Sequence, residues 1–380
     1  MRVRTYQVCS NCIMDTSDPR ITFDDRGWCD YCRNYYEQIQ PNWHTDEQGE
    51  RTLASIAERI RREGKGREYD CIIGLSGGPD SSYTVYVAKE LMSLRPLVFH
   101  VDAGWNSQQA VRNIERVVDG LGLDLFTEVV NWEEMKDLQV AFLRSQIPDQ
   151  DYPQDMSFFS GLYKFAVKNR VRYVLTGANY STECCREPEE WGAYPGIDVT
   201  LVRDIHRRFG TRPLTTFPMV DILQYKIYYK YFLGMDVIKP LNHTPYVKRE
   251  AEAFLTGRFG WEPFRHKHHE SRFTRFFEDY WLPRKFGFDK RRAHLSSLIL
   301  TGQMTREEAL LRVAKPELDE EVLAQEFAYV AKKLDLTIVE LRELFDGQNK
   351  TYHAYRNKRA LIGLGAKAMK WLRLERRFFR

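Results

Sequence analysis

Residues 76–82 read Ser-Gly-Gly-Pro-Asp-Ser-Ser, and they stand between a short apolar run and a helical pattern. Because Gly77 and Gly78 have no Cβ, the backbone here can turn its N–H groups toward a ligand. A helix that begins near Asp80 would point its positive N-terminal end at the same place. Further donors are the hydroxyl groups of Ser76, Ser81 and Ser82. The pattern predicts a phosphate-binding turn, with a serine-capped strand-to-helix turn as the alternative. It lacks the Gly-Lys-Ser/Thr ending of a Walker A loop.

Four cysteines form a second group with its own chemistry, in the spacing CxxC-x16-CxxC at Cys9, Cys12, Cys29 and Cys32. Each pair can present two sulfurs from one tight turn, which favours a four-thiolate structural zinc site. Residues 1–40 are too few to fold around an apolar core, so the metal would supply the missing free energy. An iron–sulfur cluster, or four unrelated buried cysteines, are the alternatives.

The composition bounds the class of protein. The chain has 380 residues, of which 43% are hydrophobic, and a formal net charge of +4. These values argue against global disorder and give no support for a nucleic-acid partner. No apolar run approaches the roughly 20 residues that a membrane span needs, and the N-terminus lacks an apolar signal-peptide core. We expect a cytoplasmic protein whose cysteines are thiols or metal ligands.

Four segments follow one another along the chain. They are the cysteine-rich residues 1–40, a polar linker at 41–66 with a short helical pattern at 51–66, alternating strands and helices at 67–260, and a mostly helical region at 261–380. Hydrophobic periodicity predicts strands at 69–75, 96–101, 123–130 and 172–176, and helices at 81–91, 107–121, 132–145 and 158–169. This alternation indicates an α/β fold with a parallel, doubly wound sheet. Ligand sites in such sheets lie at the carboxyl ends of strands, where the 76–82 loop stands.

The loop resembles the PP-loop ATP pyrophosphatases, whose signature is SGGxDS and whose fold is the adenine nucleotide alpha hydrolase-like sheet. The resemblance implies that ATP is cleaved between its α- and β-phosphates, that AMP is transferred to an oxygen, and that the loop grips the departing pyrophosphate. It implies ATP and Mg²⁺ as cofactors, with Asp80 acting on magnesium-bound phosphates. By the same resemblance ATP contacts Leu75, Ser76, Gly77, Gly78, Asp80, Ser81, Ser82, Val101, Asp102 and Gly177. Catalytic roles fall to Ser76, Asp80, Ser81 and Lys248.

Two classes of reaction are open to such a loop. In one, ammonia displaces AMP from the activated oxygen; in the other, a sulfur donor attacks an adenylated tRNA base. Some tRNA-thiolating enzymes also carry an N-terminal CxxC ribbon, but they usually read SGGKDS, where this chain has Pro79. They also need active-site cysteines, and the candidates here are Cys71, predicted in a strand, and the adjacent pair Cys184 and Cys185. We expect these three to be buried or incidental.

Over nearly the whole chain the sequence resembles the N-acetyl sugar amidotransferases of surface-polysaccharide synthesis, of the WbpG/PseA type. The residues that carry the resemblance are the ribbon, the SGGPDS loop, "VDAGWNS", "TGANYSTE" and the block at 262–310. It implies an ATP-dependent conversion of an acetamido group on a nucleotide-linked sugar into an acetamidino group, in O-antigen or other surface-glycan synthesis. Ammonia would come from a separate glutaminase subunit similar to that of the histidine pathway, with a cyclase-like protein as a further expected partner.

The block at 262–310 supplies the expected substrate-binding residues. Helical spacing from His268 places Arg272, Arg275 and Asp279 on one stripe, opposite an aromatic stripe. The basic stripe is either a solvated face or a wall that binds phosphates and a sugar carboxylate. The predicted substrate-binding residues are Asn179, Lys267, His268, Arg272, Arg275 and Arg291.

The tail at 350–380 holds ten Lys and Arg residues against one acid. We expect it to dock the glutaminase partner or to pack as a terminal helix. Weak peripheral contact with a membrane surface, or with RNA, are the alternatives.

Overall fold

The computed structural model describes residues 5–194, 196–265 and 267–371, with side chains up to residue 368. Its centre is a five-stranded sheet in the order β3-β2-β1-β4-β5, in which every neighbouring pair is parallel. The strands are β1 (Cys71–Gly74), β2 (Pro96–Asp102), β3 (Leu125–Val129), β4 (Tyr173–Leu175) and β5 (Asp236–Ile238). The chain runs outward from β1 to β2 and β3, and then returns to β4 on the other side of β1. The direction of winding therefore changes between β1 and β4, which is the place where such sheets bind ligands.

Side chains alternate between the two faces of the sheet, and each face builds its own core. Ile72 and Val174 belong to the larger core, whereas Cys71, Ile73 and Leu175 belong to the second one. Over the larger core lie α5 (Trp132–Ser145), α6 (Tyr152–Lys168) and α8 (Val199–Phe209). Over the second core lie α2 (Glu47–Glu63), α3 (Pro79–Tyr86), α4 (Gln108–Leu121) and α9 (Lys248–Phe259). The predicted parallel, doubly wound α/β sheet is confirmed.

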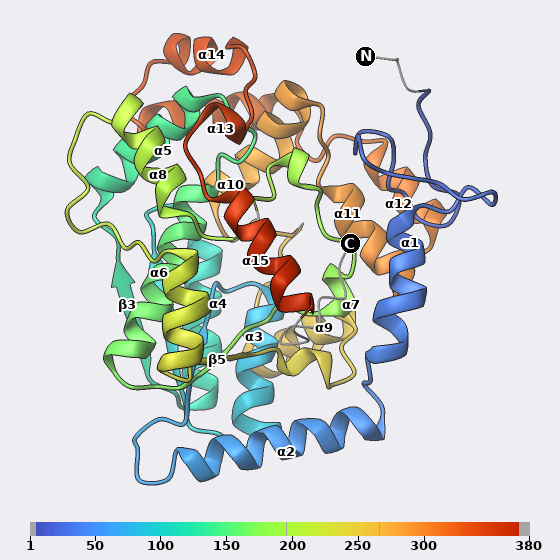
Figure 1. Cartoon of the computed structure of the whole chain (residues 1–380), viewed down its shortest axis with the longest axis vertical. Helices are drawn as coiled ribbons and strands as arrows, with labels where there is room; N and C mark the ends of the chain where they lie inside the picture. Colours follow the sequence, from blue (N-terminus) through green and yellow to red (C-terminus); the bar gives the residue numbers. More distant parts are fainter. Residues whose placement is uncertain (1–4, 195, 266, 372–380) are drawn as a thin grey trace.

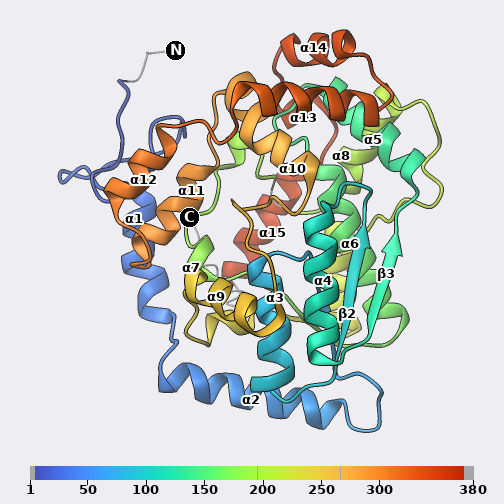
Figure 2. The same ribbon diagram turned by 180° about the vertical axis from the view of Figure 1, so that it is seen from behind.

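The helical C-terminal region covers the carboxyl ends of the strands. In Figure 2 the arrows of β2 and β3 point toward α10, α13 and α14, while α2 lies at the opposite end. The elements of this region are α10 (Arg272–Phe276), η7 (Phe277–Phe286), α11 (Arg291–Leu300), α12 (Arg306–Val313), α13 (Glu320–Lys333), α14 (Ile338–Asp346), η8 (Tyr352–Ala354) and α15 (Arg359–Trp371). This placement puts the C-terminal region over the predicted ligand edge.

The cysteine-rich N-terminus packs beside α11 and α12 (Figure 1). Arg306 on α12 donates to the carbonyl oxygens of Cys9 and Cys12, and Arg292 on α11 donates to that of Ile13. Its short helices are α1 (Asp30–Asn34), η1 (Tyr35–Ile39) and η2 (Gln40–Asn42). The remaining short elements are η3 (Val87–Leu91), α7 (Tyr180–Glu183), η4 (Glu189–Trp191), η5 (Gln224–Phe232) and η6 (Pro240–Asn242).

The four predicted strands and four predicted helices between 69 and 176 are all present, with shifted ends. Residues 41–66, expected to be a linker, contain the 17-residue helix α2, which buries Leu53 and Ile60 in the second core. The helix expected from His268 begins only at Arg272. His268 has a left-handed φ of 64°, and the Ser271 hydroxyl caps α10 by accepting from the Thr274 N–H. No described helix is long and apolar enough to cross a membrane.

Candidate active site at the carboxyl edge of the sheet

The 76–82 loop leaves β1 and turns directly into α3. Gly77 has φ +87°, and a Cβ there would lie 2.6 Å from the carbonyl oxygen of Ala110, so only glycine fits. The Trp261 indole N–H donates to the Gly77 carbonyl at 3.0 Å. Gly78 is the N-cap of α3 and Pro79 its first residue, a position where the missing N–H costs nothing. The loop thus has a fixed backbone that opens at a helix N-terminus, as a phosphate site requires.

The serines of the loop divide into two kinds. The Ser76 and Ser81 hydroxyl oxygens lie 3.1 Å apart, and Ser81 accepts from the Ser76 N–H at 3.3 Å. Both hydroxyls therefore stand at the mouth of the loop. Ser82 is fully buried, and its hydroxyl finds no partner in the described structure. The structure therefore does not bring Ser82 to the loop surface, although the sequence predicted a contact with ATP.

The strand-end loops on either side of β1 complete this edge. After β2, Asp102 accepts from the Gly104 N–H at 2.8 Å and from the Asn106 amide at 3.1 Å. After β4, Gly177 touches α3 so closely that a Cβ would lie 2.7 Å from the Asp80 carbonyl carbon and 2.8 Å from the nitrogen of Ser81. The close approach at Gly177 is thus made by the first turn of α3.

Two further predicted residues, Leu75 and Val101, are buried at the strand ends. The Leu75 carbonyl oxygen lies 2.8 Å from Nδ1 of His100, whose Nε2 lies 2.9 Å from the Asn106 amide. Burial lowers the pKa of His100. A neutral ring that donates from Nδ1 and accepts at Nε2 satisfies both contacts. Leu75 and Val101 are therefore buried side chains beneath the strand-end loops, and their contribution to this edge is through the backbone.

Asp80 faces the C-terminal region. It accepts a hydrogen bond from the hydroxyl of Tyr246, a residue whose pKa is raised by burial and by Asp80 itself. Burial alone would lower the pKa of Lys267, but Glu183 and Asp80 outweigh it and raise that pKa. Lys267 also pairs with Glu183 at 2.8 Å. The phosphate loop and the C-terminal region therefore share one electrostatic environment around Asp80.

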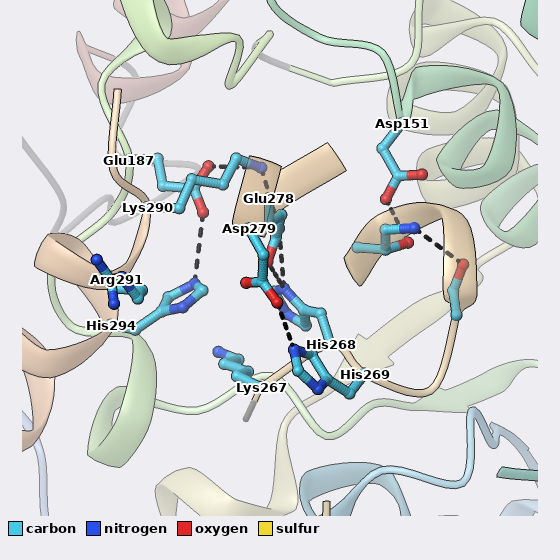
Figure 3. A network of polar contacts seen from close by, with 12 residues as sticks. Asp151, Glu187, Lys267, His268, His269, Glu278, Asp279, Lys290, Arg291 and His294 are labelled. Carbon is cyan, nitrogen blue, oxygen red and sulfur yellow. Dashed lines mark hydrogen bonds and ion pairs between the residues drawn. The ribbon is translucent and has the colours of Figure 1, made fainter. Parts of the chain in front are cut away.

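Lys267 adjoins an inner polar network (Figure 3). The side chains of this network come from η7, from the start of α11 and from the segment before α10. Lys290 pairs with Glu187 at 3.0 Å and with Glu278 at 3.3 Å. Glu278 also accepts from His268 at 3.1 Å, and Glu187 lies 3.4 Å from His294. Although burial opposes charge on both, Glu278 raises the pKa of His268 to about 9 and Lys290 lowers that of Glu187 to about 2. These partners are therefore charged at neutral pH.

Three aspartates add negative charge to this network. Burial raises the pKa of Asp149 well above its usual value, that of Asp151 to about 7 and that of Asp155 to about 6. Asp155 is nevertheless accessible to solvent. The three network cations, Lys267, Lys290 and His268, are each matched by a glutamate. The side of the network that holds the three aspartates is consequently acidic, whereas the small cavity lined by Lys248, Lys267 and Arg291 holds more basic than acidic side chains.

The predicted substrate-binding residues reach different places. Lys267 and His268 belong to the inner network, but Arg272 and Arg275 both pair with the buried Glu326 of α13. Arg291 lines a small cavity together with Lys248, Lys267 and His294, with its guanidinium held by Asp289 and Glu317. Asn179 is buried and caps α7. Lys248, at the start of α9, is 3.9 Å from Glu252. The structure therefore gathers Lys248, Lys267, His268 and Arg291, and places Arg272, Arg275 and Asn179 in supporting contacts.

Sequence reasoning missed the acidic part of this site. Asp149, Asp151 and Asp155 fall within seven residues directly before and inside α6. Their spacing was a usable signal, because three carboxylates so close together need a shared function or shared counterions. Glu183 ends the quoted "TGANYSTE" and was passed over, and Tyr246 carried no signal.

The four cysteines form one buried cluster. Their ligand atoms lie within 4.8 Å of one another, with Sγ–Sγ distances of 3.6 Å for Cys9–Cys32, Cys12–Cys29 and Cys29–Cys32. A tetrahedral zinc ion with Zn–S bonds of about 2.3 Å needs sulfurs about 3.8 Å apart. Burial raises the pKa of the Cys12 thiol, which a divalent cation would offset. The cluster therefore fits a metal, and its closed shell indicates a structural role.

The other cysteines are buried in packing positions. Cys71 lies in β1, and burial raises the pKa of its thiol. Cys184 and Cys185 are both 4% exposed. The Cys185 N–H donates to the Ser297 hydroxyl at 2.9 Å, and Cys184 contacts the Ser297 carbonyl at 3.8 Å. None of these three thiols faces the phosphate loop as a nucleophile would.

Comparison with known proteins finds a family match for the C-terminal part of the chain. Residues 270–372 match the family described as LPS biosynthesis protein WbpG-like, C-terminal domain. A segment of 141 residues, 37% of this chain, is 26% identical to the uncharacterized protein MJ1599 of Methanocaldococcus jannaschii, and it spans about half of that relative (48%).

Two solved structures show low overall likeness. The NH3-dependent NAD synthetase of Campylobacter jejuni is 14% identical, with a TM-score of 0.32, 80% of this chain covered and 98% of that one. The NMN synthetase of Francisella tularensis is 14% identical, with a TM-score of 0.30, 77% of this chain covered and 96% of that one. Neither likeness bears on activity. The resemblance predicted from the sequence is confirmed over residues 270–372, which match the C-terminal domain of WbpG-like LPS biosynthesis proteins.

Proposed function

We propose that the chain is an ATP-dependent sugar amidotransferase, which converts an acetamido group of a nucleotide-linked N-acetyl sugar into an acetamidino group and releases AMP and pyrophosphate. The observation that carries the proposal is that the WbpG-like domain begins directly against the phosphate loop, where a carboxylate oxygen of Glu270 lies 1.7 Å from the place that a Cβ on Gly78 would take. A loop of this kind holds phosphates, and the domain above it comes from a glycan-biosynthesis family. The activated group and the nucleotide would therefore meet between them.

The reaction solves a problem of amide chemistry. An amide carbonyl carbon is a poor electrophile, and its oxygen is a poor leaving group. If that oxygen attacks the α-phosphorus of ATP, the bond from the α-phosphorus to the bridging oxygen breaks and pyrophosphate leaves. Ammonia then adds to the carbon, the carbon–oxygen bond breaks, AMP departs with the former amide oxygen, and the amidine takes up the remaining proton. ATP, amide and ammonia thus become amidinium, AMP and pyrophosphate.

The chain's residues would bind and orient the reactants. The loop backbone at Gly77 and Gly78 and the hydroxyls of Ser76 and Ser81 are suited to hold the phosphates that leave. Mg²⁺ would supply charge neutralisation on those phosphates when bound. Asp80 fits a magnesium ligand because it stands in the first turn of α3 and has a hydrogen-bond donor on one oxygen.

The acidic side of the network suits the other half of the reaction. Carboxylates bind cationic and donor-rich groups, such as ammonium, an amidinium and the hydroxyls of a sugar. Of the three aspartates on this side, Asp155 is the exposed one. We propose that substrate phosphates lie on the Lys248 and loop side, and that the acetamido group and ammonia lie on the Asp155 side.

Ammonia would come from a separate glutaminase subunit of the histidine-pathway type, with a cyclase-like protein as a further partner, and the protein would work in the cytoplasm. Zinc is proposed for the cysteine cluster. The basic residues of 350–371 belong to η8, α15 and the adjoining chain, and the rest of the tail, 372–380, lies outside the described residues. We propose this tail as a contact for the glutaminase or, weakly, for a membrane surface.

The test is release of AMP and pyrophosphate from ATP in the presence of N-acetylated sugar nucleotides and ammonium. The purified chain should use ammonium directly, and should use glutamine only after a glutaminase subunit is added. ADP and orthophosphate as products would refute the proposal. A tRNA-thiolating activity is the rival, which the burial of Cys71, Cys184 and Cys185 disfavours. Thiolation of unmodified tRNA with a sulfur donor, without turnover of sugar nucleotides, would establish that rival.

A further inference from the structure

A carboxylate that has no role in the proposed reaction lies against the phosphate loop. One carboxylate oxygen of Glu270 stands 1.7 Å from the position that a Cβ on Gly78 would take. The oxygen therefore rests on the α-carbon of the residue that caps α3. This is the N-terminal end of the helix, where the phosphates of a nucleotide would bind.

The backbone that presents Glu270 is tightly held. The Glu270 carbonyl accepts from the Ser107 N–H at 2.7 Å, and the Arg272 N–H donates to the Trp105 carbonyl at 2.9 Å. Between them Ser271 forms an antiparallel bridge with Asn106. Backbone hydrogen bonds thus join the segment after β2 to the start of the WbpG-like domain beside the loop. Glu270 is therefore presented by a rigid backbone.

Among the described residues, the Glu270 side chain acts electrostatically on His268, whose pKa it helps to raise, but it has no direct contact with a cation. Within the described parts of the chain its carboxylate accepts no hydrogen bond and forms no ion pair, and the residue is only partly exposed. Most other acidic groups of the site have such partners, as Glu183, Glu187 and Glu278 do. His268 pairs directly with Glu278 rather than with Glu270. A negative group without a direct ion pair beside a phosphate site would repel the ligand, unless a cation comes with it.

We propose that Glu270 is a metal-binding carboxylate of the phosphate loop: it disfavours metal-free phosphates and binds the divalent cation that enters with the pyrophosphate end of ATP. Magnesium usually binds one or two protein carboxylates together with substrate phosphates. Asp80 supplies one carboxylate from the first turn of α3, and Glu270 supplies a second from the opposite wall. The inference rests on the proposed function only in that the ligand carries a pyrophosphate group.

The experiment compares wild type with Glu270→Gln by calorimetric titration of inorganic pyrophosphate and of ATP, with and without added Mg²⁺. Magnesium is omitted rather than chelated, because a chelator would also strip a metal from the cysteine cluster. Without magnesium the variant should bind pyrophosphate about tenfold more tightly, as expected from removing a like charge about 6 Å away at an effective dielectric of about 40. With magnesium this advantage should disappear, because the variant has lost a ligand.

The matched control is Glu262→Gln, which removes one charge from the same segment. Glu262 pairs with Arg112 and Arg116 on α4 and does not face the loop. This control should show the wild-type gain in affinity on adding magnesium, and the melting temperatures of both variants confirm that they fold. An equal magnesium-dependent gain in wild type and Glu270→Gln would overturn the inference while leaving the proposed function intact. Failure of wild type to bind either ligand would overturn both.

Discussion

Gly177 offers the sharpest test of how the site is assembled. A Cβ on this residue would lie 2.7 Å from the Asp80 carbonyl carbon and 2.8 Å from the Ser81 nitrogen, where ordinary contacts begin at 3.4 Å. Both neighbours are backbone atoms, so they cannot swing aside as a flexible side chain could. Gly177→Ala must therefore push the first turn of α3 away from β4. Overpacking of this kind costs about 1–3 kcal/mol.

The same displacement should reach the ligand. Hydrogen bonds weaken when donor and acceptor move by a few tenths of an ångström, so loop amides moved with α3 should hold pyrophosphate about tenfold more weakly or worse. Denaturant unfolding measures the loss of stability, and calorimetry with pyrophosphate and Mg²⁺ measures the loss of affinity. Both should fall together in Gly177→Ala.

The control is Gly257→Ala, inside α9, where a Cβ meets no atom within 4 Å. An alanine in a helix interior is about 0.5–1 kcal/mol better than glycine, so this variant should be more stable than wild type and should bind pyrophosphate equally well. If Gly177→Ala is as stable as Gly257→Ala and binds pyrophosphate like wild type, the close contact between β4 and α3 does not shape the loop.

Three further predictions concern the network and the metal. The pKa of His268 is raised to about 9 by Glu278 despite burial. The ion pair therefore stabilises the fold fully below pH about 6.5, and this stabilisation is lost as pH rises through about 9. In His268→Gln the free energy of unfolding should lose that pH dependence, and an unchanged dependence on pH would contradict the ion pair. Asp155 is the exposed aspartate beside the network, so Asp155→Asn should fold like wild type but need more ammonium for half-maximal AMP release; an unchanged ammonium requirement would remove Asp155 from the ammonia side. Cys12→Ser should lower bound zinc below one ion per chain by metal analysis, whereas Cys184→Ser should keep it; equal metal in both would remove Cys12 from the ligand set.

Local patterns predicted the sheet and the loop because their causes are local. The apolar run before Ser76 and the two glycines mark the end of β1 and the turn that follows it. The cysteine spacing determines a four-sulfur cluster by the geometry of two tight turns, and the structure closes it as expected. The short strand β5 was missed because three residues give no usable periodicity.

The C-terminal part of the site could not be predicted in the same way. Helical spacing put Arg272 and Arg275 on one stripe correctly, but it could not show that Glu326, about 50 residues later on α13, neutralises both. Nor could it show that the chain turns left-handed at His268 and so leaves the helix. Pairing between distant segments therefore neutralised part of a basic sequence block, which its own sequence could not reveal.

The loop after β2 and the start of the C-terminal domain depend on each other, and this explains where the site lies. The hydrogen bonds from Ser107 to Glu270 and from Arg272 to Trp105 join them across a sequence gap of about 165 residues. The α/β sheet alone offers a phosphate loop with Asp80 but lacks Lys267 and Glu270. The C-terminal domain alone offers the carboxylates and cations of its network but no phosphate loop. The proposed reaction, in which a substrate is adenylated and then attacked by ammonia, needs both at once, and we therefore propose that it takes place at the contact between the sheet and the domain.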